Sequence, residues 1–482
     1  MLAKRIDPSL PTPLYMQIIH ALIHEIQRGR LLPGAALPSS REMAATLGVN
    51  RKTIVQAYED LIAQGWLRSA GTRGTIVSES LPAVELRRGH PGLAEGVHGP
   101  SVAEYSFKHA ADVHVLTPQW LKLDEGSPDG RLFPAEVLVR GYRNAIARAS
   151  RENRLLYGDP RGSPLLRQAL ADMLRIERGV VAEPDNICVT RGSQMGLYLV
   201  ARALVQPGDV VLVEALTYQP AMALFRDRGA NVLPVALDEQ GVCVEDVERL
   251  CRSHRVRAIF LTPHHQFPTT VALQPDRRLQ LLQLARQFAF AVIEDDYDHE
   301  FHFEFQPLLP MASYAPERVI YVGSLSKLVL PALRIGYVVA PTEVINSVAQ
   351  EVMMLDGMGN VMTEDAAAEL ITTGEVRRRS RKVAQIYARR RKTFARALAT
   401  ELAGLANFDM PDGGLAFWLR FPDQQLLDRI EARAPAHKVW IAPSHSYVAQ
   451  PGIARGLRFG FASLNEREAL EALRRVKAAA TE

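Results

Sequence analysis

The feature that most restricts the fold is a series of short apolar runs, rich in β-branched residues, that alternate with amphipathic helical stretches from Leu121 onward. The runs read DVVLVEA, ANVLPVA, RAIFLTP, FAVIEDD and RVIYVGS. Strands that are separated by helices pair mainly in parallel, and the helices cover both faces of the sheet. The pattern therefore predicts an α/β domain whose ligands bind at the carboxyl ends of its strands.

The first eighty residues follow a different pattern, in which helical spacing comes first. Ser39 and Glu42 form a capping-box pair, and Asn50 is placed to cap the helix that follows the Leu47-Gly48-Val49 turn. Two β-prone stretches then flank a glycine-bearing turn. The predicted order is a helix over 14–26, a helix from Ser40, a helix from Arg51 to Gln64, and strands at 66–68 and 75–77. This order predicts a winged helix-turn-helix.

In a winged helix-turn-helix, the N-terminal residues of the recognition helix lie against the bases in the major groove. Here those residues are polar and long enough to reach base edges or phosphates, namely Asn50, Arg51, Lys52 and Thr53. Arg41 on the preceding helix suits a phosphate contact, and Arg73 at the wing tip suits the minor groove. A small structural helical domain with ordinary surface arginines is the alternative.

Three stretches of this region resemble the N-terminal domain of GntR-type bacterial regulators: PLYMQIIHALIHEI, LPSSREMAATLGVNRKTIVQAYEDL and GWL…GTRGT. The resemblance implies that double-stranded operator DNA is a partner. It also implies that the DNA-contacting positions include Arg41, Arg51, Thr53 and Gly71.

The chain divides into three parts by pattern. A chain of 482 residues is longer than a chain that usually folds around a single hydrophobic core, so more than one domain is expected. Residues 80–117 lose both periodicities and gather Pro, Gly and His, which is typical of a semi-flexible linker. We therefore expect a DNA-binding domain over residues 10–79, a linker over 80–117 and a larger domain over 118–482.

The segment GSLSKLVLPALRIGY, from Gly323 to Tyr337, places Lys327 after a β run and a serine-rich turn. A lysine whose pKa is lowered forms a Schiff base with a carbonyl compound such as pyridoxal phosphate. Ser324 and Ser326 are placed to donate to a phosphate, and Arg334 adds charge-assisted bonds. An ordinary surface lysine is the alternative.

Three further segments have polar residues where a strand ends. In FAVIEDDYDHEF, Asp295 suits the pyridine nitrogen of pyridoxal phosphate, and Tyr297 suits its phenolic oxygen. In VTRGSQMG, Ser193 and Gln194 open a helix whose amides and dipole favour a phosphate. In VEALTYQPA, Tyr218 is placed to stack on a planar ring. Each segment has a common alternative. The acidic residues suit a solvated or metal-binding loop, Ser193 suits a simple Gly-Ser turn, and Tyr218 suits a core tyrosine.

Taken together, the order of phosphate turn, stacking aromatic, acidic residue and lysine resembles the fold-type I, aspartate-aminotransferase-like enzymes, from about Leu121 to the C-terminus. The resemblance implies pyridoxal 5′-phosphate as cofactor and a smaller C-terminal α/β subdomain. It implies that Tyr157, in LLYGDPRGSPLLRQALA, reaches the cofactor phosphate of a partner subunit. It also implies that Arg458, in LRFGFA, holds an α-carboxylate.

The chain departs from that family at HHQFPTT, where the family usually carries Asn-Pro-x-Gly. Phe267 stands for the asparagine and Thr270 for the glycine. One hydrogen bond to the cofactor's phenolic oxygen is therefore lost, or is supplied by His265 or Gln266. Nothing in this segment has the spacing of metal ligands, and we expect no metal site.

A GntR-like winged helix followed by an aminotransferase-like domain is the arrangement of the MocR/GabR family of transcription regulators. The resemblance implies a homodimer exchanged head to tail and a large domain that senses an effector. The effector is either an amine or amino acid that displaces Lys327 from its Schiff base, or pyridoxal phosphate itself. The alternatives are a working aminotransferase with a secondary DNA-binding domain and, less supported because Arg458 suits a retained carboxylate, a decarboxylase or lyase.

Composition adds few constraints. The net charge of +4 neither demands nor excludes nucleic acid. Three cysteines without CxxC spacing predict small buried residues in a reducing cytosol. No apolar run approaches 18 residues and the N-terminus lacks a signal-peptide core, so we expect a cytoplasmic protein without a membrane partner. Two basic clusters, Arg377–Lys382 and Arg389–Lys392, are expected on one long helix. They form either a solvated face of that helix or an auxiliary contact to the phosphate backbone of DNA.

Overall fold

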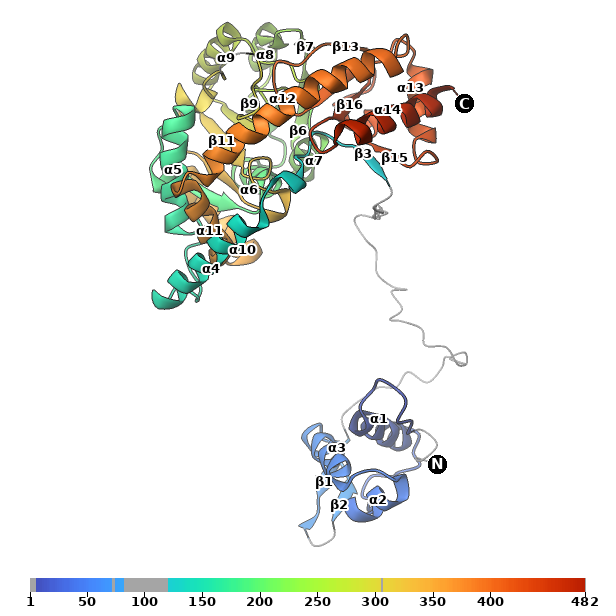
Figure 1. Ribbon diagram of the computed structural model, residues 1–482. Coiled ribbons are helices and arrows are strands. Elements are labelled where there is room, and N and C mark those ends of the chain that lie inside the picture. Colours follow the sequence, from blue (N-terminus) through green and yellow to red (C-terminus); the bar gives the residue numbers. More distant parts are fainter. Residues whose placement is uncertain (1–5, 72–73, 82–119, 305–306, 482) are drawn as a thin grey trace. The chain divides into compact units, whose positions relative to one another are not determined.

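The computed structural model describes residues 6–71, 74–81, 120–304 and 307–481 (Figure 1). The chain forms two compact units, Met1–Asp112 and Val113–Glu482, and each is described by itself. The predicted linker lies outside the described residues, apart from its first two positions.

Over residues 6–71 and 74–81, the first unit contains three helices and a two-stranded antiparallel sheet. Ser39 and Glu42 form the predicted capping box at the second helix, and Gly48 ends that helix in the left-handed conformation, with φ 65°. The Asn50 side chain accepts a hydrogen bond from the Lys52 amide and so caps the third helix. The elements are α1 (Leu14–Gln27), α2 (Ser40–Leu47), α3 (Arg51–Ala63), β1 (Leu67–Ser69) and β2 (Thr75–Val77). This is the predicted winged helix-turn-helix order.

One small apolar core holds this unit together. Ile18 and Leu22 of α1 pack with Ile54 and Leu61 of α3, and all four are fully buried. The strands pair with Leu67 opposite Val77, so the wing is fixed to the same core. The N-terminal end of α3 is left on the surface, where Arg51 and Lys52 are exposed.

The second unit is built on a seven-stranded sheet with the order β4-β12-β11-β10-β9-β5-β6. Only β12 runs antiparallel to its neighbours, so the sheet is mainly parallel, as predicted. The strands are β4 (Ile187–Thr190), β5 (Val210–Glu214), β6 (Asn231–Val235), β9 (Val256–Leu261), β10 (Ala291–Asp296), β11 (Val319–Ser324) and β12 (Gly336–Val339).

Helices cover both faces of this sheet (Figure 1). One face packs against α6 (Ser193–Leu204), α7 (Gln219–Asp227) and α10 (Thr342–Asp356). The other face packs against α5 (Pro164–Arg178), α8 (Val244–Ser253) and α9 (Pro275–Gln287). Alternation along β10 assigns Ile293 to the first face and Val292 to the second, so consecutive residues of this strand serve different cores.

A smaller C-terminal subdomain follows the long helix α12 (Glu375–Glu401), which extends to it from the helices beside the sheet (Figure 1). Its sheet has the order β13-β14-β16, and β15 pairs in parallel with β3 from the start of the unit. The elements are β3 (Leu121–Leu123), β13 (Asn407–Phe408), β14 (Ala416–Arg420), α13 (Gln424–Arg433), β15 (Val439–Ile441), β16 (Gly456–Gly460) and α14 (Glu466–Thr481). The unit also contains α4 (Ala135–Arg151), α11 (Val361–Thr372) and the short pair β7 (Leu237–Asp238) and β8 (Gly241–Val242).

Both basic clusters lie on α12, as the sequence predicts. Arg391 is buried and pairs with Glu304, and Arg390 donates to Asp129 over 2.9 Å. These two arginines therefore hold α12 against the rest of the unit. Their contacts favour a structural role over a phosphate contact for this part of the second cluster.

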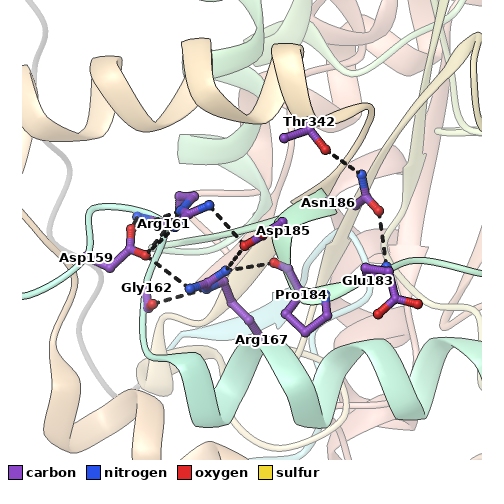
Figure 2. Close-up of polar contacts among 9 residues, drawn as sticks. All are labelled: Asp159, Arg161, Gly162, Arg167, Glu183, Pro184, Asp185, Asn186 and Thr342. Carbon is purple, nitrogen blue, oxygen red and sulfur yellow. Dashed lines mark hydrogen bonds and ion pairs between the residues drawn. The ribbon is translucent and has the colours of Figure 1, made fainter.

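A polar network fixes the segment between α4 and α5 (Figure 2). Arg167 of α5 is buried and donates to Asp159 and to the Pro184 carbonyl, over 3.0 and 2.9 Å. Arg161 links Asp159 to Asp185 in the same way. The network ties the loop that contains Tyr157 to the chain just before β4, which is the first strand of the sheet.

Among the described residues, the helices of this protein are too short or too polar to cross a bilayer.

Candidate functional site

Lys327 lies just beyond β11, next to the residues that follow β10. Its Nζ is 3.7 Å from Asp298 Oδ2 and 4.3 Å from the centre of the Tyr297 ring. Burial lowers the pKa of Lys327 below its ordinary value, and the charge of Asp298 opposes that shift. A lysine in this setting is closer to the neutral, nucleophilic amine than a surface lysine is.

Asp295 is the last buried carboxyl of β10 on the Ile293 face. It is 5% exposed, and its Oδ1 has no hydrogen-bond partner among the described residues. Burial, followed by the charge of Asp296, raises the pKa of Asp295 to about 7, and Lys327 opposes the shift. A buried carboxyl without a partner is costly, so a group that donates a hydrogen bond or carries positive charge is favoured here.

Arg458 connects the small subdomain to this site from β16. It is 1% exposed, and it donates to the Glu125 carbonyl over 2.9 Å and to the Pro268 carbonyl over 2.7 Å. It also donates to the Tyr297 hydroxyl over 3.3 Å, and that hydroxyl donates to the His265 carbonyl. A fixed guanidinium beside Lys327 suits a bound carboxylate.

Phe267 forms the centre of an aromatic wall. Its ring is 5.3 Å from that of Tyr218, and the Arg458 guanidinium lies 4.8 Å from the Phe267 ring centre. The Tyr218 hydroxyl donates to Gln194 over 2.8 Å, so two predicted cofactor residues contact each other directly.

The residues expected to replace the family asparagine have other partners. Gln266 Nε2 donates to the Leu216 and Phe267 carbonyls, and His265 Nδ1 lies 2.6 Å from Asp298 Oδ1. That His265 or Gln266 supplies the missing bond therefore stays a prediction. Thr270, which stands for the family glycine, keeps the left-handed backbone that glycine favours, with φ 67°.

The start of α6 forms a cradle of backbone amides. Gly192 precedes Ser193 with φ 83°, and Arg334 packs over it while donating to the Arg191 carbonyl over 2.7 Å. A helix N-terminus beside a guanidinium is suited to a phosphate. From the lysine segment, the Ser324 hydroxyl donates to the Ile335 carbonyl and accepts from the Ser326 amide, so it stabilises the turn itself.

Tyr157 lies apart from the other predicted residues. It is 96% exposed, in the loop between α4 and α5. None of the contacts described above involves it, which agrees with the expectation that it serves a partner subunit but does not test it.

The predicted DNA-contacting residues lie together on the first unit. Arg41, Asn50, Arg51 and Lys52 are exposed, Thr53 is half-buried, and Gly71 has φ 62° in the turn between the strands. Within the described residues, no ion pair engages Arg41, Arg51 or Lys52. Arg73 lies outside the described residues.

Asp298 and Glu125 were not predicted as site residues. Glu125 lies near Arg458 and Lys327, and burial raises its pKa. Asp298 lies two positions beyond the end of β10, and this place after a strand end is the signal in the sequence that could have indicated it. Glu125 lies in the connection after β3, where no pattern indicated the site.

Comparison with known proteins follows the same division of the chain. Residues 14–77 match the family of bacterial regulatory proteins of the gntR type, and residues 118–476 match aminotransferase class I and II. The probable rhizopine catabolism regulatory protein MocR of Rhizobium meliloti is 31% identical over 86% of this chain and 83% of its own length. The chain belongs to the MocR family of transcription regulators.

A second relative has the same arrangement along nearly the whole chain. The pyridoxine biosynthesis transcriptional regulator PdxR of Corynebacterium glutamicum is 28% identical over 96% of this chain and 94% of its own length. Among solved structures, α-aminoadipate aminotransferase LysN of Thermus thermophilus superposes with a TM-score of 0.69 and 28% identity, covering 75% of this chain and 92% of that one. The large unit of this MocR-family chain therefore has the fold of an aminotransferase.

The cradle at α6 depends on a glycine of β12. A Cβ added at Gly336 is 2.4 Å from the Gly192 carbonyl carbon and 2.7 Å from the Ser193 amide nitrogen, so the backbone has to move. We expect Gly336→Ala to lower the thermal unfolding midpoint and to weaken the binding of inorganic phosphate, measured by calorimetry. The control is Gly130→Ala, whose Cβ meets nothing closer than 3.5 Å. Equal midpoints for the two variants contradict the packing argument.

Proposed function

We propose that the winged helix binds operator DNA and that the large unit binds pyridoxal phosphate, so that the state of the cofactor site sets the affinity for the operator. The observation that carries the proposal is the buried Asp295, whose free oxygen lies in the same site as Lys327, Tyr297 and Arg458. A purely structural domain has no need of a carboxyl buried without a partner.

The residues present fit the cofactor. Asp295 suits the pyridine nitrogen, Tyr218 and Tyr297 suit the ring and its phenolic oxygen, and Lys327 suits covalent attachment. The amides of Ser193 and Gln194 suit the phosphate. Ser324 and Ser326, at the end of β11, and Arg334, just before β12, suit the same phosphate. Bound pyridoxal phosphate supplies an aldehyde that reacts reversibly with amines and a ring that withdraws electrons.

The effector is then recognised through an amine and, for an amino acid, also through a carboxylate. Lys327 competes with the effector's amine for the cofactor aldehyde, and Arg458 binds the carboxylate. The relatives described above are named as regulators of rhizopine catabolism and of pyridoxine biosynthesis. We propose an amine or amino acid, or the cofactor itself, as the effector of this chain.

Regulation follows from linkage between the site and the DNA-binding unit. A ligand that binds one arrangement of the protein more tightly moves the population toward that arrangement by the difference in binding free energy. Operator DNA acts on the same equilibrium, so the ligand and the DNA alter each other's affinity by the same factor. We place this function in the cytoplasm, where the chromosome lies.

An exposed apolar surface supports a homodimer. The surface joins the Tyr157 loop to α4 and to the end of α10, and its exposed members are Val139, Ile146, Leu155, Leu156, Tyr157, Met353, Met354 and Leu355. The Gly158 amide lies 2.9 Å from Met358 Sδ, so the loop and the end of α10 adjoin. Exposed apolar residues in this number favour burial against another chain. We propose that Tyr157 enters the partner's site there, in the head-to-tail dimer of the family.

A working aminotransferase is the second candidate function, because Lys327, Asp295 and Arg458 are all in place and the fold is that of aminotransferases. Incubating the protein with pyridoxal phosphate, candidate amino acids and 2-oxoglutarate separates the two. Turnover of about one per second or faster is typical of an enzyme and contradicts a pure sensor.

Replacing Lys327 tests the cofactor assignment. We expect Lys327→Ala to remove the visible absorbance band of the lysine-bound cofactor while leaving the circular dichroism spectrum unchanged, because Lys327 alone carries an amine among the site residues described above. Lys392→Ala, an exposed change on α12, is the control and keeps the band. A band that persists in Lys327→Ala shows that attachment lies elsewhere.

Replacing Arg51 tests the recognition helix. A side chain that reaches a base edge contributes about 1–3 kcal/mol, so Arg51→Ala should weaken operator binding by roughly ten- to hundredfold in fluorescence anisotropy. The cofactor absorbance should not change. Arg28→Ala, an exposed arginine at the end of α1, is the matched control. Unchanged binding in Arg51→Ala means that another surface contacts the DNA.

A further inference from the structure

A second cluster of polar side chains lies on the face of the sheet opposite Asp295. Asp295 and Asp296 are consecutive on β10, so their side chains point to different faces. Asp296 therefore lies on the Val292 face, where its Oδ2 is 2.7 Å from the Tyr321 hydroxyl and 3.0 Å from His299 Nδ1. None of the residues assigned to the cofactor lies in this cluster.

Histidines from two connections converge on Asp296. His264 follows β9, and His299 and His302 follow β10. The rings of His264 and His299 stack at 4.4 Å, and His264 Nε2 lies 2.6 Å from His302 Nε2. One donor atom each of His264, Asp296 and His299 lies within 4.8 Å of the others, and these three residues are 2–4% exposed.

Two atoms of this cluster point to a missing ligand. His264 Nδ1 and Asp296 Oδ1 are buried and have no hydrogen-bond partner among the described residues. A buried polar atom of this kind is destabilising unless something binds it. The Tyr321 hydroxyl holds the other oxygen of Asp296, which orients the carboxylate as outer groups orient metal ligands.

The cluster supplies imidazole nitrogens and a carboxylate oxygen, which are the donor types that coordinate a transition metal. The nearby Arg178, 3.8 Å from Asp296, is itself paired with Glu300.

The cluster has an entrance. A pocket of about 980 Å³ is lined by His264 and His302, together with Thr269, Arg278 and Asp412. His302 is half-buried at its wall, so the cluster adjoins this pocket.

We propose that His264, Asp296 and His299 bind a divalent transition-metal ion of the Zn²⁺ type, with His302 as a further ligand on the pocket side. Two or three imidazoles with one carboxylate select Zn²⁺ and its neighbours over Mg²⁺ and Ca²⁺, which prefer oxygen. The sequence led us to expect no metal site, because the ligands come from two segments that neither share a motif nor lie close in the chain.

Equilibrium dialysis of the full chain against Zn²⁺ tests the proposal, with bound metal counted by mass spectrometry. We expect one Zn²⁺ per chain, a raised thermal midpoint on binding, and no displacement by millimolar Mg²⁺. His264→Asn and His299→Asn should each raise the dissociation constant by more than about tenfold, since even outer-shell changes cost that much. His445→Asn, an exposed histidine of the same unit, is the control.

Two outcomes overturn the site. One is a wild-type chain that binds no Zn²⁺ under these conditions, a result that does not depend on the folding of any variant. The other is Zn²⁺ binding that falls as much in His445→Asn as in His299→Asn, which assigns the ion to surface histidines. The half-buried His302→Asn is a milder second variant, and unchanged affinity there removes His302 from the ligand set.

Discussion

The structure of the large unit depends on how two adjacent carboxyls of one buried strand are compensated. Strand alternation sends Asp295 and Asp296 to opposite faces, so a single group cannot neutralise both. Asp296 has Tyr321, His299 and Arg178 around it. Each carboxyl keeps one oxygen without a partner among the described residues, but Asp295 has Lys327 as the charge that opposes its burial, and its pKa is raised to about 7. The candidate cofactor site is built on that difference.

The surroundings of Asp295 come from separate parts of the chain. Lys327 follows β11, Tyr218 precedes α7, and Arg458 belongs to the C-terminal subdomain. Arg458 contacts backbone carbonyls on both sides of the site, at Glu125 and Pro268. We propose that a carboxylate that draws the guanidinium away from either carbonyl changes the packing of the subdomain against the sheet. This contact gives a physical route from a small ligand to a movement of the large unit.

Much of this architecture could be predicted from sequence, since it rests on local patterns. The capping box at Ser39, the Asn50 cap and the apolar runs of the parallel sheet each depend on residues close in the chain, and the predicted elements are confirmed. Contacts between distant segments carry no such signal. Two such contacts are Glu125 with Arg458 and His264 with His299. They depend on how the connections after different strands pack together, and neither hydrophobic periodicity nor secondary-structure propensity encodes that packing.

The central claim is that the cofactor site and the DNA-binding unit are energetically coupled. The most direct measurement is the affinity of the full chain for an operator selected from random-sequence DNA, taken without cofactor, with pyridoxal phosphate, and with added amines. Coupling between the two sites predicts a change in operator affinity of about fivefold or more between at least two of these states. It also predicts that the operator changes the affinity for the same ligand by the same factor. Equal operator affinity in every state contradicts it.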